Sequence, residues 1–258
     1  MKFMRPVVPV TAGALFLTGW AATPALADDT TAPDASITSP ALQDEVYGRR
    51  ALTFQGTATD DTGVASVGVA IQDRDTRLWY RPDGTWGAYH RYSATLSAPG
   101  AASTGWSFTW TPAEPGAYMV QAVAKDAAGH PDAELPWRRF DVDTQAPDTA
   151  ISRPTALTTT VSRNTTVSLN GTATDDHGVR YILVAIQNKA TGKWLRTGGT
   201  WGSIMWHRRA VTRPGAPSTT WTTSQKMSVS GTFIIRIGSE DRAGLVDPST
   251  PYRQYVVR

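Results

Sequence analysis

The segment Gly56-Thr57-Ala58-Thr59-Asp60-Asp61 returns 115 residues later as Gly171-Thr172-Ala173-Thr174-Asp175-Asp176. The same offset relates two more pairs of segments, 69–72 with 184–187 and 84–87 with 199–202. A repeat at one fixed offset indicates two copies of a single unit, and a unit of this length has an ordinary domain size. We therefore expect one domain over residues 28–143 and a second over residues 144–258.

Within each copy, apolar residues alternate with polar ones over short runs. Val67, Val69 and Ile71 follow this pattern in the first copy. Alternation bounded by Gly, Pro and Asp is typical of strands with one buried face. About seven such strands per unit favour a Greek-key sandwich. The sequence therefore predicts an all-β protein of two tandem antiparallel β-sandwiches. The predicted core comprises Phe54, Val69, Ile71, Trp106 and Tyr118, with Leu169, Val184, Ile186, Trp221 and Phe233 in the matching places.

Several segments resemble bacterial Ig-like domains. The linker Asp143-Thr144-Gln145-Ala146-Pro147-Asp148 resembles the start of such a domain, and so does the repeated Gly-Thr-Ala-Thr-Asp-Asp segment. Residues 124–129 and 239–244 resemble the last hairpin, although His130 and Leu245 stand where asparagine often follows. The resemblance covers residues 30–258 and implies an Ig-like fold. It also implies a role as an adhesin, a stalk or an accessory module of a secreted enzyme, and the fold alone does not choose among these.

The first 27 residues have the composition of a secretory signal peptide. Lys2 and Arg5 precede an apolar stretch from Val7 to Ala22, and the small residues of Ala25-Leu26-Ala27 follow. This stretch is too short and too interrupted to span a bilayer, so we expect it to be removed after export. We expect an extracellular protein, free or associated with the cell surface, with no membrane span. The chain has no cysteine, so its domains depend on packing and not on disulfides.

The two copies carry opposite charge. Residues 28–143 contain 9 Lys and Arg against 16 Asp and Glu, and residues 144–258 contain 14 against 6. The net charges of −7 and +8 concern partners and association rather than the fold. Arginines such as Arg208 and Arg209 match the phosphates of an anionic cell-wall polymer, and a solvated basic face is the alternative. No interleaved aromatic and basic motif of a nucleic-acid module is present, and the oligomeric state stays open.

No motif indicates catalysis. The chain has no cysteine nucleophile, no His-Glu-x-x-His segment, no Gly-x-Ser-x-Gly elbow and no phosphate-binding glycine loop. The four histidines lie far apart in the sequence, and none recurs in the other copy. We therefore expect no catalytic residue, and an enzyme is only a remote alternative.

Repeated aspartates form a candidate calcium site in each copy. In an Ig-type chain path, the domain start, the loop after the second strand and the last hairpin meet at one pole. Calcium takes six to eight oxygen ligands, with several carboxylates among them. The alternative is that Asp-Asp-x-Gly only makes a turn. The candidates are Asp34, Asp60, Asp61 and Asp126 in the first copy and Asp148, Asp175, Asp176 and Asp241 in the second, where Asp143 can join.

Tryptophan is the other candidate ligand-binding residue. Trp79 and Trp86 flank a polar, Gly-rich loop in the first copy, and Trp194 and Trp201 flank its counterpart in the second. Exposed indole rings stack on sugars, whereas large aromatic side chains usually bury most of their area. The four residues therefore either pack under an extra hairpin or contact a ligand.

Three functions follow from these features. The leading one is an extracellular adhesion or binding module whose partner is a polysaccharide or an anionic cell-wall polymer. The second is a structural spacer with no ligand site, and the third, remote, is an enzyme. Exposure of Trp86 and Trp201 on a shared face would favour binding over spacing, and an enzyme would need a pocket with convergent polar groups.

Overall fold

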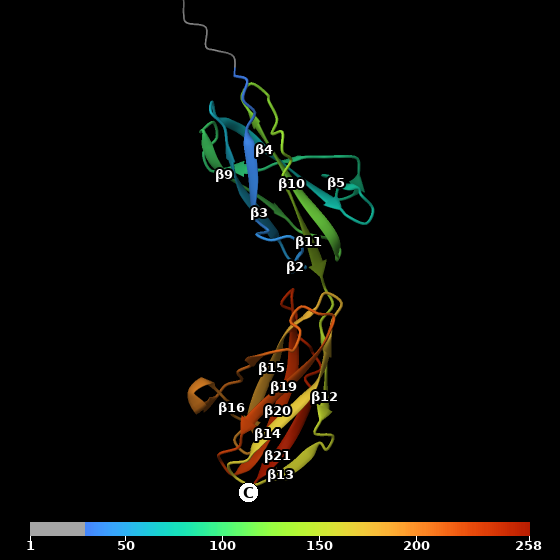
Figure 1. The fold of residues 1–258 in the computed structure, drawn as a ribbon, viewed down its shortest axis with the longest axis vertical. Helices are drawn as coiled ribbons and strands as arrows, with labels where there is room; N and C mark the ends of the chain where they lie inside the picture. The colour runs from blue at the N-terminus through green and yellow to red at the C-terminus, as the bar shows by residue number, and fades with distance from the viewer. Residues whose placement is uncertain (1–28) are drawn as a thin grey trace, which may run out of the picture. The chain divides into compact units, whose positions relative to one another are not determined.

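The computed structural model describes residues 29–258, which fold into β-sandwiches (Figure 1). The predicted signal peptide, residues 1–27, lies outside the described residues. Among residues 29–258 the only helical element is the single turn η1 (Thr197–Gly199). No helix in this part of the chain has the length and apolar character needed to cross a membrane.

The first sandwich consists of two sheets. One sheet has the order β1-β3-β9-β8, formed by β1 (Asp34–Ser39), β3 (Leu52–Thr59), β9 (Ser103–Trp110) and β8 (Thr95–Leu96). The other has the order β2-β11-β10-β4-β5-β6, formed by β2 (Glu45–Gly48), β11 (Trp137–Asp143), β10 (Gly116–Asp126), β4 (Val64–Asp73), β5 (Trp79–Tyr80) and β6 (Trp86–Gly87), with β7 (Tyr92–Ser93) also paired to β4.

The second sandwich repeats this topology. Its smaller sheet has the order β12-β14-β19, formed by β12 (Asp148–Arg153), β14 (Thr166–Thr174) and β19 (Ser218–Lys226). Its larger sheet has the order β13-β21-β20-β15-β16-β17, formed by β13 (Thr158–Val161), β21 (Tyr252–Val257), β20 (Gly231–Asp241), β15 (Val179–Asn188), β16 (Trp194–Leu195) and β17 (Trp201–Gly202), with β18 (His207–Ala210) paired to β15.

One pairing in each sandwich departs from the antiparallel prediction. β2 runs parallel to β11, and β13 runs parallel to β21. In both copies the chain leaves the first sheet after its first strand and crosses to the edge of the other sheet. That crossing brings the new strand alongside the last strand of the domain in the same direction. The all-β tandem sandwich is confirmed, with this parallel edge pair added to it.

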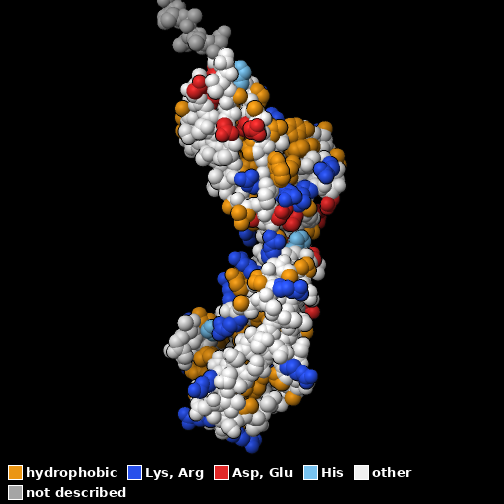
Figure 2. Space-filling model, viewed as in Figure 1, with side chains coloured by type: hydrophobic (Ala, Val, Ile, Leu, Met, Phe, Trp, Pro, Cys, Tyr) orange, Lys and Arg blue, Asp and Glu red, His pale blue; other side chains and the backbone are white. Residues whose placement is uncertain are grey.

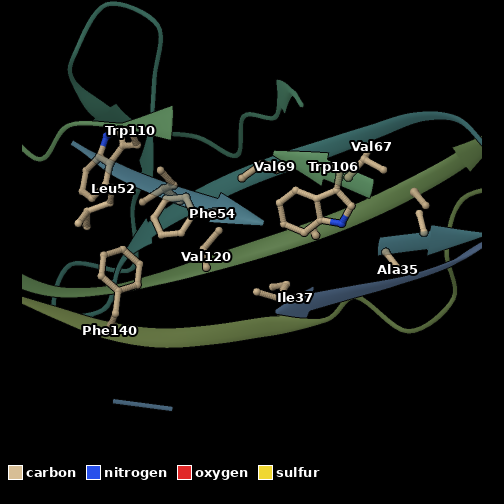
Figure 3. Close-up of a cluster of buried hydrophobic side chains, with 14 of the residues drawn as sticks. Ala35, Ile37, Leu52, Phe54, Val67, Val69, Trp106, Trp110, Val120 and Phe140 are labelled. Carbon is tan, nitrogen blue, oxygen red and sulfur yellow. The ribbon is translucent and has the colours of Figure 1, made fainter. Parts of the chain in front are cut away.

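The alternation in the sequence produces the core as predicted. Residues 52–59 of β3 alternate strictly between buried and exposed, because successive side chains of a strand point to opposite faces. All ten predicted core residues are buried, with exposed fractions of 4% or less. Figure 3 shows Phe54, Phe140 and Trp110 together in the first core. The ring centroids of Phe54 and Phe140 lie 5.2 Å apart.

The repeated glycine of the Gly-Thr-Ala-Thr segment lies directly under a buried tryptophan. A Cβ on Gly56 would lie 2.6 Å from the indole of Trp106, and closer still to the carbonyl oxygen of Ser36. The Trp106 indole N–H donates to that same carbonyl at 3.1 Å. Gly171 lies under Trp221 in the same way in the second sandwich, although the Trp221 indole N–H donates to the Thr172 carbonyl. Only glycine leaves room for the ring here, which explains why the repeat keeps it.

Candidate functional site

A short hairpin next to the core places the candidate tryptophans in each sandwich. β5 pairs with β6 so that Trp79 faces Gly87 and Tyr80 faces Trp86. Tyr80 and Trp86 pack against the first core, whereas Trp79 makes an edge contact with Tyr89 on the other side. Because alternate side chains of a strand point to opposite faces, one tryptophan of each pair faces the core and the other faces away.

The second sandwich repeats this division. Leu195 and Trp201 pack against its core, while Trp194 lies at the preceding position of β16, opposite Gly202. All four candidate tryptophans are half-buried. The two in a domain therefore point to opposite faces of their hairpin and do not form one flat platform.

A groove opens beside Trp201 in the second sandwich. Its volume is about 340 Å³, and its walls come from β15, the β16–β17 hairpin, the end of β19 and the start of β20. The apolar part of the lining includes Ile186, Leu195, Trp201, Met227 and Phe233. The Trp201 and Phe233 ring centroids lie 5.8 Å apart. The Trp201 ring thus packs beside Phe233 and lines the groove.

In the first sandwich the corresponding space is filled by aromatic rings. Trp110 lies opposite Leu52, and its counterpart Gln225 lies opposite Val167 in the same register. The Trp110 ring centroid lies 5.6 Å from that of Tyr80, 5.1 Å from that of Tyr118 and 6.5 Å from that of Trp86. The second sandwich has Leu195 and Phe233 in place of the two tyrosines. Loss of the Trp110 ring leaves the groove open.

Two cationic side chains line this groove. Arg196 and Lys226 are both exposed. The stem of Arg196 crosses Gly202, where a Cβ would lie 3.0 Å from its Cδ. One guanidinium nitrogen of Arg196 donates to the Ser203 hydroxyl at 2.8 Å, which holds the group at the groove. An aromatic side chain with two cationic residues beside it is suited to a sugar ring that carries an acidic group.

The predicted arginines behave differently from each other. Arg208 donates twice to the Glu240 carboxylate, from Nε and Nη2, at 2.9 Å each, and its guanidinium lies over the Tyr181 ring. Arg209 is exposed, and one of its nitrogens donates to the Arg208 carbonyl. Arg208 is therefore engaged in an internal ion pair, whereas Arg209 keeps donors available on the surface.

Three aspartates of the candidate calcium set converge. Asp143 ends β11, Asp175 follows β14, and Asp241 ends β20. Ligand oxygens of the three lie within 4.8 Å of one another. Their exposed fractions are 1%, 6% and 0%. The loop after the second strand and the last hairpin therefore meet at one pole, and the linker residue joins them.

The other predicted carboxylates lie outside this cluster. Asp34 and Asp148 are exposed, and among the described residues neither belongs to a group with ligand atoms within 4.8 Å. Asp176 lies 3.3 Å from the His177 Nδ1, and Asp61 accepts a hydrogen bond from the Thr31 hydroxyl. Asp60 caps its own turn by accepting the Thr62 and Gly63 N–H groups.

In the first sandwich the aspartate of the last hairpin, Asp126, has an imidazole partner. The Asp126 Oδ2 lies 2.8 Å from the His130 Nδ1, and the Oδ1 accepts the backbone N–H groups of Gly129 and His130. These hydrogen bonds lower the pKa of Asp126 despite its burial. In the second sandwich Leu245 stands in the place of His130, so Asp241 has no imidazole partner there.

Burial and neighbouring negative charges raise the pKa values of two carboxylates in the second sandwich. Desolvation, with smaller contributions from Asp175 and Asp143, raises the pKa of Asp241 to about 6. Desolvation followed by the charge of Asp143 also raises the pKa of Asp175. These raised pKa values mean that Asp175 and Asp241 stay ionised only at a cost in free energy.

Comparison with known proteins identifies the fold family. Residues 33–122 match the family model described as "Bacterial Ig domain". The first sandwich is thus similar to a bacterial Ig domain. The second sandwich repeats the sequence pattern of the first and nearly all of its topology, without a counterpart of β8. No curated protein matches the sequence.

Solved structures similar to these Ig-like domains come from several kinds of protein. One is a tetra-tandem repeat from the extending region of a large adhesion protein, with 18% identity and a TM-score of 0.31, covering 87% of this chain and 49% of that one. Another comes from a study of host cell surface retention of a 1.5-MDa bacterial ice-binding adhesin, with 13% identity and a TM-score of 0.38, covering 89% and 66%. A third is described as "Putative membrane anchored protein from Corynebacterium diphtheriae", with 10% identity and a TM-score of 0.30, covering 89% and 59%. The chain thus spans about half to two thirds of these structures.

Sequence reasoning missed the importance of Gln225 in the second Ig-like domain. The signal was present, because the 115-residue offset aligns Gln225 with Trp110 and Lys226 with Thr111. A core tryptophan replaced by glutamine on the buried side of a strand marks a place where the two copies differ in packing. The groove therefore lies where the repeat is imperfect.

Proposed function

We propose that this protein is an extracellular adhesion module without enzymatic activity, and that its second Ig-like domain binds an acidic polysaccharide chain. The observation that carries the proposal is the groove beside Trp201, with Arg196 and Lys226 on its walls. The same space in the first domain is occupied by Trp110 and its aromatic neighbours. In this proposal the second domain binds the ligand, and the first domain has a structural role.

The charge of the second domain supports an anionic partner. Its net charge is +8, and Lys and Arg side chains are spread over its visible face (Figure 2). A field of one sign attracts oppositely charged polymers and raises their association rate. The first domain, at net −7, repels the same polymers. Among the anionic polymers outside a cell, one with sugar rings also uses the indole face.

The experiment is a titration of the full chain with polygalacturonate, with uncharged dextran as the matched control ligand. Replacing Arg196 or Lys226 by glutamine should weaken polygalacturonate binding about tenfold, because each removes a charge-assisted contact. Arg81→Gln, at the corresponding position of the first domain, is the control variant and should leave binding unchanged. Equal binding of dextran, or equal binding by all variants, would contradict the assignment.

A structural spacer is the second candidate function. It is favoured by the half-burial of Trp86 and Trp201, since both rings pack against the core of their own domain. A spacer requires no ligand contact from these rings. If the chain binds neither polygalacturonate nor a purified anionic wall polymer at low salt, the result would favour a spacer over an adhesion module.

A further inference from the structure

The three converging aspartates, Asp143, Asp175 and Asp241, have one common feature. In each, the Oδ1 accepts a backbone N–H of its own turn. The Asp143 Oδ1 accepts the Gln145 N–H at 2.8 Å, and the Asp175 Oδ1 accepts the His177 N–H at 3.0 Å. The Asp241 Oδ1 accepts the Leu245 N–H at 2.8 Å. The turn explanation of these aspartates is therefore correct for one oxygen of each carboxylate.

The second oxygen of each carboxylate is not explained by a turn. The Oδ2 atoms of Asp143, Asp175 and Asp241 are all buried without a hydrogen-bond partner. Buried polar atoms are nearly always paired, and an unpaired charged oxygen costs several kcal/mol. Three such atoms in one place, on residues at least 94% buried, indicate a missing positive partner.

Protein cations do not fill this role. The His177 Nδ1 lies 3.5 Å from the Asp143 Oδ2 and 3.3 Å from the Asp176 Oδ2, yet it forms no hydrogen bond with either. In the first domain the corresponding aspartate is Asp126, and its Oδ2 lies 2.8 Å from the His130 Nδ1. The second domain has Leu245 at that position, so Asp241 has no imidazole partner from its own hairpin.

We propose that Asp143, Asp175 and Asp241 form a calcium site that joins the end of β11 to the pole of the second domain. Two oxygens that both bind one calcium ion at Ca–O distances of 2.3–2.6 Å can lie at most about 4.6–5.2 Å apart. Each pair among the three aspartates has ligand oxygens within 4.8 Å, so the pairs meet this limit. Magnesium needs shorter bonds and near-ideal octahedral geometry. Backbone carbonyls and water complete the coordination shell.

The site has a structural consequence for the tandem chain. Asp143 belongs to the last strand of the first domain, whereas Asp175 and Asp241 belong to the second. A single ion bound by all three holds the linker residues 144–147 against the second domain. Calcium then stabilises the second domain by mass action, since it binds only the folded arrangement.

Two amide variants test the site in the full chain after dialysis against EDTA. Calcium titration by calorimetry should show wild-type binding with a Kd of about 10⁻⁴–10⁻³ M, the range of extracellular modules. Asp241→Asn and Asp175→Asn should each bind one equivalent fewer. Their melting temperatures in EDTA should be no lower than that of the wild type, because an amide removes the repulsion without changing shape.

Asp148→Asn is the matched control, because Asp148 is an exposed carboxylate of the same domain outside the cluster. It should keep the wild-type stoichiometry and the calcium-induced rise in melting temperature. Magnesium at the same concentration should give a smaller rise. The proposal is overturned if the wild type does not bind calcium, if the Asn variants bind as many equivalents as the wild type, or if magnesium gives the larger rise.

Discussion

Gln225 of the second domain occupies the position that Trp110 occupies in the first. Trp110 lies opposite Leu52 across a β-sheet ladder, and Gln225 lies opposite Val167 in the same register. The tryptophan packs against four aromatic rings, whereas the glutamine borders an open groove. This substitution, together with Leu195 and Phe233 in place of Tyr80 and Tyr118, separates a closed core from a candidate binding site.

Truncation at this position should affect the two domains very differently. Trp110→Ala removes a ring that is 4% exposed and should lower the free energy of unfolding of the first domain by about 3–5 kcal/mol. Gln225→Ala should change that of the second domain by less than about 0.5 kcal/mol. Scanning calorimetry of both variants measures the difference, and equal costs would contradict the account of the groove.

The glycine beneath each buried tryptophan gives a second prediction. Gly171→Ala should destabilise the second domain by about 1–3 kcal/mol or more, because the added methyl meets the Ala150 carbonyl and the Trp221 ring. Gly238→Ala is the control in the same domain, since its new Cβ would have its nearest neighbours at 4.0 Å. Urea unfolding of the two variants compares them, and a larger loss at position 238 would be inconsistent with this packing.

Alkaline pH should destabilise the first domain through Tyr118. Burial raises the pKa of Tyr118 to about 12, above the value of about 10 in an unfolded chain. The folded domain therefore keeps a proton that the unfolded chain loses, so stability is full below pH 10 and falls as pH rises toward 12. The loss should reach on the order of 2–3 kcal/mol.

Tyr118→Phe isolates this contribution. The variant should lose less stability than the wild type between pH 9 and pH 12, although it also loses the hydroxyl donation to the Glu114 carbonyl. The second domain carries Phe233 at the same position and serves as an internal comparison. Parallel pH profiles for wild type and variant would show that Tyr118 does not titrate in this range.

The Arg208–Glu240 pair should contribute to stability and not to polymer binding. Arg208→Ala leaves a carboxylate that is only 9% exposed without its partner, which should cost about 1–3 kcal/mol. Its neighbour Arg209→Ala should cost almost nothing, because Arg209 is exposed. Polygalacturonate affinity should be unchanged by Arg208→Ala. A stable Arg208→Ala variant that fails to bind would restore Arg208 as a ligand residue.

Much of the fold could be predicted from periodicity alone. Val69, Ile71 and their counterparts are buried because a two-residue period in a strand fixes which face each side chain takes. The parallel pairing of β2 with β11 was not predictable in this way. It depends on where the chain crosses between sheets, and neither four-residue edge strand carries a distinctive pattern.

The candidate sites were predicted less completely. The sequence indicated that aspartates of the loop after the second strand and of the last hairpin meet at one pole, and it allowed Asp143 to join. It could not show that Asp148 stands apart, since strand pairing decides the direction of that side chain. The segment Asp-Thr-x-Ala-Pro-Asp at 143–148 also occurs at 29–34, a repeat that marks Asp143 as more than a linker residue.

Tryptophan showed the limit of reasoning from residue type. Trp79, Trp86, Trp194 and Trp201 recur in both copies, and their repetition does not separate packing from binding. Pairing across each hairpin decided which rings face the core. The groove then depended on a residue that does not recur, because the missing Trp110 ring creates space only where its aromatic neighbours have also changed.

Filling the groove tests the account most directly. Gln225→Trp restores in the second domain the ring that closes the first, without removing any cation. The measurement is polygalacturonate affinity and melting temperature on the same preparation of wild type and variant. The account predicts a melting temperature equal to or above that of the wild type, with affinity reduced at least tenfold. A folded Gln225→Trp variant that binds polygalacturonate as tightly as the wild type would contradict it.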